Sequence, residues 1–410
     1  MICPKVQKSQ KTVTFRERFM AGKRNSFMAK PILALFLVPW VAGLLLGDPG
    51  LALAASHSPS WPLWDHFRQH FLQSDGRVID RTDRDRSTSE GEAYTLYFSL
   101  VSGDRKTFRK VLEWTRNNLA GGDLDHHLPA WIWGKRPNGG WGILDVNPAS
   151  DADCWIAYAL IEAGRIWKIP VYGRQGRNLL SMIEKNETAF LPGYGWALLP
   201  GPWGFRTPDG TGRLNPSYLP PEILLDFEAV SPRSPWNQIL ETTLSHMGSI
   251  APHGFVPDWI AVTKNGQVRP DPVTGPLGSY DAIRVYLWAS ILPSRSPLRK
   301  KLLSHMSGMV RYLDHHLRPP LYANTLAGWT AGKGPPGFSA AILPLLRARG
   351  DERHLKSLLK SLKRMRHHGL YGTPPPYYDQ VLALFGTGFL EGRYGFGAKG
   401  RLLLPARPRP

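Results

Sequence analysis

Cysteine is nearly absent from this chain of 410 residues, which contains only Cys3 and Cys154. Cys3 lies in a segment that we expect to be removed. The mature chain then forms no internal disulfide, and it tolerates an oxidising compartment without exploiting it. The same scarcity excludes zinc sites built from cysteines. We expect Cys154 to be a buried small hydrophobic residue, because it lies within a predicted helix and has no adjacent histidine.

Signals for a metal site or for nucleic-acid binding are also lacking. Several histidines are adjacent in sequence, so they share no helix face and have no zinc-site spacing; these pairs are His126-His127, His315-His316 and His367-His368. Basic residues outnumber acidic ones by 51 to 32. They are spread through helix-like segments without a binding motif or interleaved aromatic residues. We therefore expect no metal, no cofactor and no nucleic-acid partner.

The N-terminal segment has the features of a targeting signal. Three basic residues at positions 23, 24 and 30 precede an apolar run over 31–47, and Ala52-Leu53-Ala54 follows. The run is short and interrupted by proline and glycine, which is typical of a secretory signal with an A-x-A cleavage site. We expect residues 1–54 to be a signal peptide and the protein to be periplasmic or secreted. An uncleaved single-span anchor is the alternative, and Met20 or Met28 would give a start of more ordinary length.

Removal of residues 1–54 leaves 356 of the 410 residues. The removed segment holds eight basic and two acidic residues, so the net charge falls from +19 to +13. A chain of this length can bury a sizeable core as one domain or two. We find no internal low-complexity linker, and we expect residues 55–410 to form the folded part without a membrane span.

Helices dominate the pattern after Pro59, because apolar residues recur at i, i+3, i+4 and i+7 and alternating runs are few. The expected helices pair into roughly six hairpins, which fits either a solenoid or a closed toroid, and the absence of a repeat of about 34 or 40 residues argues against the common solenoids. Their approximate ranges are 61–74, 90–101, 104–119, 150–166, 173–190, 220–230, 235–248, 279–291, 297–317, 338–349, 352–368 and 375–389.

Three long loop regions stand out between these helices. The loops 121–149 and 192–221 are rich in glycine and tryptophan, and long irregular loops in compact domains usually carry function. The segment 254–276 contains Asn265-Gly266, which predicts a short hairpin.

Two expected helices begin with the same arrangement of acidic residues. The segments Ser89-Glu90-Gly91-Glu92 and Ser150-Asp151-Ala152-Asp153 both match a capping box, in which the serine caps the helix and the last acidic residue reaches back. Glu90 and Asp151 are then free for another role. Tyrosine and tryptophan residues follow each of them at i+4 and i+7, so each carboxylate stands above an aromatic stripe.

Asp281 begins a third helix, with Arg284 one turn later, where it favours the ionised form of the carboxylate. That suits a general base. The alternative is that these acidic residues only complement helix dipoles, at about 0.3–1 kcal/mol each, and that the aromatic stripes belong to the core. A helix start also lowers a carboxylate pKa, so a general acid at Glu90 needs an opposing effect. We expect charge repulsion from Asp151, helped by burial under a sugar, to supply it.

Six ordered motifs together resemble the family 8 glycoside hydrolases, over about Trp61 to Leu404. Within that family the resemblance is greatest to the endoglucanases encoded with bacterial cellulose synthase. The motifs are Thr88-Ser89-Glu90-Gly91, the segment 128–135 (LPAWIWGK), Ala149-Ser150-Asp151-Ala152-Asp153, the segment 215–221 (NPSYLPP), the segment 279–286 (SYDAIRVY) and the segment 332–341 (GKGPPGFSAA).

The resemblance implies an (α/α)6 barrel of six inner and six outer helices, with a cleft at the end where the inner helices begin. It implies an inverting endo-β-1,4-glucanase with Glu90 as general acid and Asp281 as general base. Asp151 matches an aspartate that holds the sugar beside the scissile bond, Tyr218 matches a tyrosine near the nucleophilic water, and Arg284 matches the arginine beside the base. The signal peptide would then precede one catalytic domain, residues 55–410, that acts on a cellulose chain and is associated with cellulose synthesis and export.

Sugar rings stack on aromatic side chains, so a glucan cleft should be lined by tryptophan and tyrosine. Among the loop aromatics we expect substrate contacts at Trp131 and Trp141 first, then at Trp133, Trp196 and Trp203. Two other functions remain open. One is a xylanase, chitosanase or mixed-linkage glucanase on the same scaffold, although the net charge of +13 would repel cationic chitosan. The other is a non-catalytic glucan-binding component of an export complex, against which the intact carboxylates count.

Overall fold

The structure is a computed structural model that describes residues 60–207 and 209–405. The predicted signal peptide and its alternatives lie outside these residues and stay predictions. Among the described helices, none combines the length and the apolar character that a membrane crossing requires.

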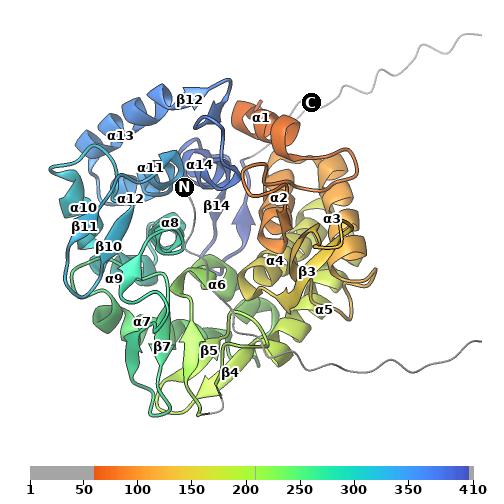
Figure 1. Ribbon diagram of the computed structural model, residues 1–410, viewed down its shortest axis with the longest axis horizontal. Coiled ribbons are helices and arrows are strands. Elements are labelled where there is room, and N and C mark those ends of the chain that lie inside the picture. The colour runs from red at the N-terminus through yellow and green to blue at the C-terminus, as the bar shows by residue number, and fades with distance from the viewer. Residues whose placement is uncertain (1–59, 208, 406–410) are drawn as a thin grey trace, which may run out of the picture. The chain divides into compact units, whose positions relative to one another are not determined.

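The helices form two concentric rings, as expected for an (α/α)6 barrel (Figure 1). The inner ring consists of α2 (Ser89–Ser102), α4 (Ser150–Trp167), α6 (Pro221–Val230), α8 (Ala282–Ile291), α11 (Pro336–Ala341) with α12 (Leu343–Ala348), and α14 (Tyr377–Leu390). The outer ring consists of α1 (Pro62–Phe71), α3 (Arg105–Leu119), α5 (Pro170–Asn186), α7 (Trp236–Ile250), α9 (Pro297–Ser304) with α10 (Ser307–Leu313), and α13 (Glu352–Arg364).

Burial follows this division. Inner helices such as α4 are buried almost all round, whereas the outer helix α13 buries only one stripe, formed by Leu355, Leu358 and Leu362. An all-round apolar helix belongs in a core and a one-sided helix at its edge. Glycines let inner helices approach closely: a Cβ on Gly386 of α14 would lie 1.9 Å from the Ala340 carbonyl oxygen of α11.

The aromatic stripes below Glu90 and Asp151 are part of the barrel core, the alternative left open by the sequence. Tyr97 and Trp155 are almost fully buried, and their rings meet edge to face at 4.9 Å. Phe385 of α14 packs against both of them. These residues hold the inner helices together below the carboxylates, and their burial makes direct contact with a substrate impossible.

Two expected helices are broken in the structure. The helix predicted over 338–349 is interrupted at Ile342, two residues before Pro344, because proline lacks the N–H that a continuous helix needs. The helix predicted over 297–317 divides at His305 and Met306 into α9 and α10.

Short antiparallel strands border the helix starts and were mostly not predicted. The expected hairpin at Asn265-Gly266 is confirmed as β7 (Ile260–Val262) and β8 (Val268–Pro270). The other strands are β1 (Ser87–Thr88), β2 (Ala130–Lys135), β3 (Trp141–Pro148), β4 (Thr188–Leu191), β5 (Gly195–Leu198), β6 (Gly212–Leu214), β9 (Leu277–Gly278), β10 (Tyr322–Asn324), β11 (Thr330–Ala331), β12 (Arg366–His367), β13 (Leu370–Tyr371), β14 (Gly395–Phe396) and β15 (Leu402–Leu403). β1 runs directly into α2, and three residues separate the end of β9 from Ala282, where α8 begins.

Glu222 in α6 is a buried carboxyl group whose two oxygens have no hydrogen-bond partner among the described residues. Burial raises its pKa from 4.5 to about 8. The folded state therefore binds this proton more tightly than the unfolded state, so stability is greatest below the unfolded pKa and declines as pH rises toward the folded pKa. By pH 7 the loss is about 3 kcal/mol.

We predict that Glu222→Gln, which keeps the shape and removes the ionisation, raises the melting temperature by several degrees near about pH 7.5 and changes it little near about pH 4.5. Calorimetry at both pH values measures this. Glu113→Gln, an exposed substitution on α3, is the control and should have no effect at either pH. Equal melting temperatures of Glu222→Gln and wild type near pH 7.5 would show that Glu222 is not held neutral by the fold.

Candidate active site

The side chain of Glu90 is placed by β1 and the first turn of α2. The helix is capped by Thr88, whose hydroxyl accepts from Gly91 N–H at 3.1 Å, so the capping box predicted for Ser89 and Glu92 is wrong by one residue. Glu92 instead accepts the Val78 N–H at 2.9 Å and is fully buried. This contact attaches the segment before β1 to the helix that carries Glu90.

The predicted capping box at Asp153 is also wrong. Ala149 precedes α4 without a side-chain cap, and the Ser150 N–H donates to the Pro200 carbonyl at 3.1 Å. Asp153 is buried with Glu187 at the end of α5. Burial raises the pKa of both carboxyl groups, the charge of Asp151 adds to this effect at Asp153, and the charge of Asp153 adds to it at Glu187.

Glu90 and Asp151 occupy equivalent positions, since each is the second residue of its helix. Asp281 precedes the first residue of α8. The three carboxylates therefore stand at the N-terminal ends of three inner helices, as expected. Their side chains differ in exposure, with 23% for Glu90, 31% for Asp281 and 4% for Asp151.

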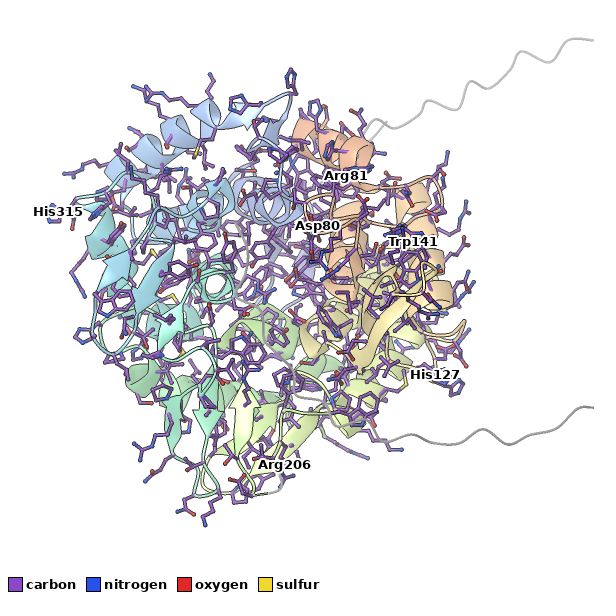
Figure 2. The ribbon with its side chains drawn as sticks, viewed as in Figure 1. Asp80, Arg81, His127, Trp141, Arg206 and His315 are labelled. Carbon is purple, nitrogen blue, oxygen red and sulfur yellow. The ribbon has the colours of Figure 1, made fainter. Side chains whose placement is uncertain are left out.

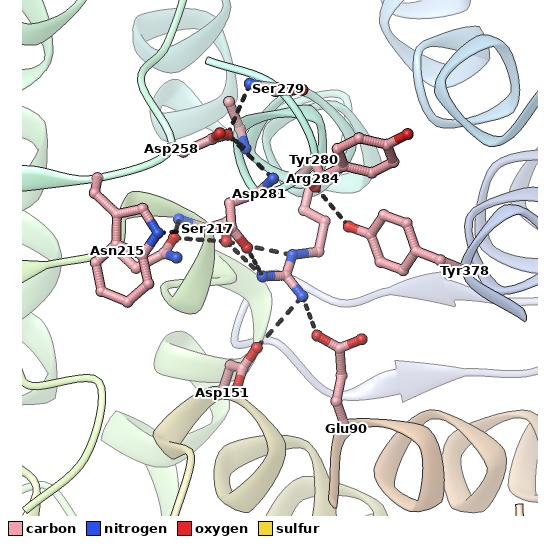
Figure 3. Close-up of polar contacts among 12 residues, drawn as sticks. Glu90, Asp151, Asn215, Ser217, Asp258, Ser279, Tyr280, Asp281, Arg284 and Tyr378 are labelled. Atoms are coloured by element: carbon pink, nitrogen blue, oxygen red, sulfur yellow. Dashed lines mark hydrogen bonds and ion pairs between the residues drawn. The ribbon is translucent and has the colours of Figure 1, made fainter. Parts of the chain in front are cut away.

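Arg284 connects these three carboxylates (Figure 3). Its Nη2 lies 2.8 Å from Asp281 Oδ1, and its Nη1 lies 3.4 Å from Asp151 Oδ2 and donates to Glu90 Oε2. The arginine side chain is only 3% exposed. A buried guanidinium needs such partners, because an uncompensated charge in the interior is strongly unfavourable. The predicted pairing of Arg284 with Asp281 is present, and the contacts with Glu90 and Asp151 are additional.

Tyr218 reaches this cluster through the short helix η1 (Pro216–Tyr218). Asn215 caps this helix by accepting the Ser217 N–H, and Ser217 Oγ accepts from Arg284 Nη2 at 2.8 Å. The ring of Tyr218 lies 5.6 Å from the guanidinium carbon of Arg284. The motif 215–221 therefore packs beside the carboxylates.

Asp258 and Trp259 are neighbours of Asp281 that the sequence did not identify. Asp258 Oδ1 accepts the N–H groups of Ser279, Asp281 and Ala282 at 2.7, 3.1 and 2.7 Å, so it caps the start of α8. The indole N–H of Trp259 donates to Asp281 Oδ2 at 3.0 Å. No local signal links residues more than 20 positions apart. The only available signal was that a carboxylate and a tryptophan stand together in a long loop, where functional residues are common.

Three of the predicted substrate-binding tryptophans lie on the sheet next to Glu90. Trp131 and Trp133 alternate with buried residues along β2, which pairs with β1 just before α2. Trp131 is 38% exposed and Trp141 is 46% exposed. Trp133 and Trp141 stack at 5.3 Å, and the guanidinium of Arg77 lies over both rings. Trp141 lies over this sheet, whereas His127 and His315 lie at opposite edges of the molecule (Figure 2).

The other two predicted tryptophans lie in separate places. Trp203 is 60% exposed, and its carbonyl accepts from Asn147 Nδ2 at 2.9 Å, so its loop is fastened to the end of β3 just before Asp151. Trp196 lies on β5, which packs against the outer helix α7, and its ring contacts Phe190. Its role as a substrate contact stays a prediction.

Comparisons with known proteins identify the family. The model of the glycosyl hydrolases family 8 matches residues 47–392. This chain belongs to that family. An endoglucanase of Xanthomonas axonopodis pv. citri is 46% identical over 88% of this chain and 94% of its own length. An endoglucanase of Escherichia coli K12 is 39% identical over 86% of this chain and 93% of its own length. The crystal structure of an endo-1,4-D-glucanase from Vibrio fischeri, 39% identical, covers 84% of this chain and 99% of its own with a TM-score of 0.77.

Burial is the largest influence on the acid groups of this family 8 site. It raises the pKa of Glu90, the charge of Asp281 raises it further, and Arg284 opposes both. Asp151 has its pKa raised to about 7, first by burial and also by the charge of Glu90. We expected the charge of Asp151 to be the main influence on Glu90. The structure corrects this, because burial is the largest cause of the raised pKa of Glu90, and the charges of Arg284 and Asp281 follow it.

We predict that Asp151→Asn moves the alkaline limb of the family 8 enzyme's pH–rate profile to lower pH. Glu90 and Asp151 compete for a proton as a coupled pair, because the charge of each opposes ionisation of the other, and asparagine at position 151 removes this contribution to the raised pKa of Glu90. The profile of kcat/KM against pH measures this limb. Asp125→Asn on the loop before β2 is the control. An unchanged limb in Asp151→Asn would mean that burial alone sets it.

Proposed function

We propose that this chain hydrolyses internal β-1,4-glucosidic bonds of cellulose with inversion, using Glu90 as general acid and Asp281 as general base. The observation that carries the proposal is the convergence of Glu90, Asp151 and Asp281 on Arg284 at one end of the barrel. The endoglucanase names of the family 8 relatives support the substrate and the reaction.

The proposed reaction has a defined proton balance. Glu90 gives its proton to the glycosidic oxygen as the bond to the anomeric carbon breaks. A water attacks that carbon from the opposite face, and Asp281 takes a proton from the water. Inverting enzymes need their two carboxyl groups roughly 6.5–9.5 Å apart to leave room for this water. Glu90 and Asp281 stand on different inner helices, which allows such a gap. Proton exchange with solvent then resets both groups.

The environments of the two carboxyl groups suit these roles. Burial favours the protonated form of Glu90, which a general acid requires. Asp281 accepts hydrogen bonds from Arg284 and from Trp259, one on each oxygen, and these contacts fix the direction of the carboxylate. Arg284 also donates to Glu90, and we expect the leaving-group oxygen of a bound substrate to compete with Arg284 for this contact.

Substrate contacts follow from the exposed aromatic side chains near these groups. We assign Trp131 and Trp141, on the sheet next to Glu90, to stacking on sugar rings, and also Trp203, whose loop is bound to Asn147 before α4. Trp133 supports Trp141 from behind. Asp151 is almost fully buried, so it can bind a sugar hydroxyl only at the base of the cleft.

The alternative polysaccharides would use the same carboxylates. The 46% identity with an endoglucanase over most of the chain favours β-1,4-glucan over xylan or mixed-linkage glucan. The net charge of +13 after removal of residues 1–54 disfavours cationic chitosan. We further propose that the protein acts in the periplasm or outside the cell and accompanies cellulose synthesis and export, which the signal-like features of residues 1–54 support.

We predict that residues 55–410 hydrolyse carboxymethylcellulose faster than xylan, chitosan or lichenan, with the α-anomer released first. Glu90→Gln and Asp281→Asn should each lower kcat by about 100-fold or more. Reducing-sugar release and NMR of the products measure this. Glu113→Gln is the control. Hydrolysis at the wild-type rate by Glu90→Gln or Asp281→Asn, or no hydrolysis of any of the four polymers, would refute the assignment.

We predict that Trp131→Ala raises KM for carboxymethylcellulose by about tenfold and changes kcat less, because a stacking contact is present before and during the reaction. Initial rates across substrate concentrations separate the two constants. The control is Tyr312→Ala on the outer helix α10, where the ring stacks on His316. An unchanged KM in Trp131→Ala would show that Trp131 does not contact the substrate.

A further inference from the structure

The three-stranded sheet β6–β7–β8 stands beside the base and has no role in the function proposed above. In this sheet Arg213 pairs with Ala261, and Ile260 pairs with Pro270. Trp259 precedes β7 and Asp271 follows β8, so they form the next opposite pair. Because side chains alternate along strands, Arg213, Trp259 and Asp271 all point to one face.

On that face Trp259 is held by its neighbours. The guanidinium carbon of Arg213 lies 4.1 Å from the centre of the indole ring, and the ring of Phe205 lies parallel to it at 6.0 Å. A cation at this distance over an aromatic face is attracted to it. The indole edge donates its N–H to Asp281 Oδ2 at 3.0 Å.

Arg213 is itself fixed by Asp271. Its Nε and Nη2 lie 2.7 and 3.2 Å from the two carboxylate oxygens, a bidentate pairing that sets the plane of the guanidinium. The Asp271 side chain is fully buried, and it also accepts two backbone N–H groups and a hydroxyl from Val273 and Thr274. Burial raises the pKa of Asp271, but these hydrogen bonds, led by that from Arg213, bring it below its usual value.

We propose that Arg213 and Asp271 are positioning residues that hold Trp259, and that Trp259 thereby fixes the carboxylate of the base Asp281. The inference rests on the proposed function, because it concerns the base of that reaction. Asp281 has 31% of its side chain exposed, and its two oxygens have one side-chain donor each, Arg284 and Trp259. The indole is a donor only, so it binds the ionised carboxylate and cannot take the proton that the base receives.

The consequence is control over both the direction and the charge of the base. Displacement of a catalytic group by about 1 Å costs about 100-fold in rate. With Oδ2 tied to the indole and Oδ1 tied to the guanidinium, rotation of the Asp281 carboxylate breaks a hydrogen bond. Arg213, Trp259 and Asp271 lie on or next to a sheet with a fixed register. They therefore hold the direction of the Asp281 carboxylate from outside the inner helices.

The experiment compares Trp259→Phe and Arg213→Gln with wild type in the chain 55–410. Trp259→Phe keeps an aromatic ring and removes the donor. We expect kcat to fall about tenfold, KM to change less than about twofold, and the acidic limb of the kcat/KM profile to move to higher pH. Arg213→Gln should shift the same limb by less, and Arg213→Lys should restore part of the loss. Melting temperatures show whether each variant is folded.

The matched control is Arg105→Gln, because Arg105 also lies over an indole, that of Trp167 at 5.4 Å, on the outer helix α3. It should leave kcat and the pH profile unchanged. A folded Trp259→Phe with wild-type kcat and acidic limb would overturn the proposal. The double variant gives a second test. If Trp259 acts through Asp281, adding Trp259→Phe to Asp281→Asn should lower kcat little further. A further fall as large as the one that Trp259→Phe causes in the wild type would also overturn the proposal. A fully active Asp281→Asn would instead refute the proposed function itself.

Discussion

The buried guanidinium of Arg284 is the constraint on which the rest of the site depends. A cation with 3% exposure is stable only when opposite charges surround it, and here they come from α2, α4 and α8. The packing of the inner helices therefore brings the three carboxylates and this cation together. The long loops then need only to add aromatic surfaces to a site whose charges are already arranged by the barrel.

Two opposing effects act on the carboxyl group of Glu90, and their sizes decide its protonation. A helix N-terminus favours the anion by about 0.3–1 kcal/mol, whereas burial of a carboxyl group can shift its pKa by several units. Burial prevails at Glu90, and at Asp151 it raises the pKa to about 7. Asp281 stands at a comparable helix start but is more exposed and has two side-chain donors. The reaction that we propose therefore assigns the roles of acid and base to carboxyl groups at similar helix starts but in different surroundings.

Sequence patterns identified the helices and the three carboxylates, because apolar periodicity and helix-start residues are local signals. The capping boxes failed for a non-local reason: Glu92 found a stronger partner in the Val78 N–H, from a segment that no helix rule considers. The helix predicted over 173–190 ends at Asn186 in the structure, because Thr188 pairs with Leu198 in the hairpin β4–β5. The contact of Trp259 with Asp281 spans three short strands, β7, β8 and β9, with the loops between them, so no local pattern predicts it.

The buried carboxyl groups away from the reaction also have a thermodynamic consequence. Glu92, Glu187 and Glu222 are fully buried, and burial raises the pKa of each above its usual value. At neutral pH the folded chain therefore holds protons that the unfolded chain releases, so folding is accompanied by proton uptake from the buffer. The heat of unfolding then includes the ionisation heat of whichever buffer is present. Proton uptake is therefore part of the folding of this barrel, just as proton transfer is part of the reaction that we propose for it.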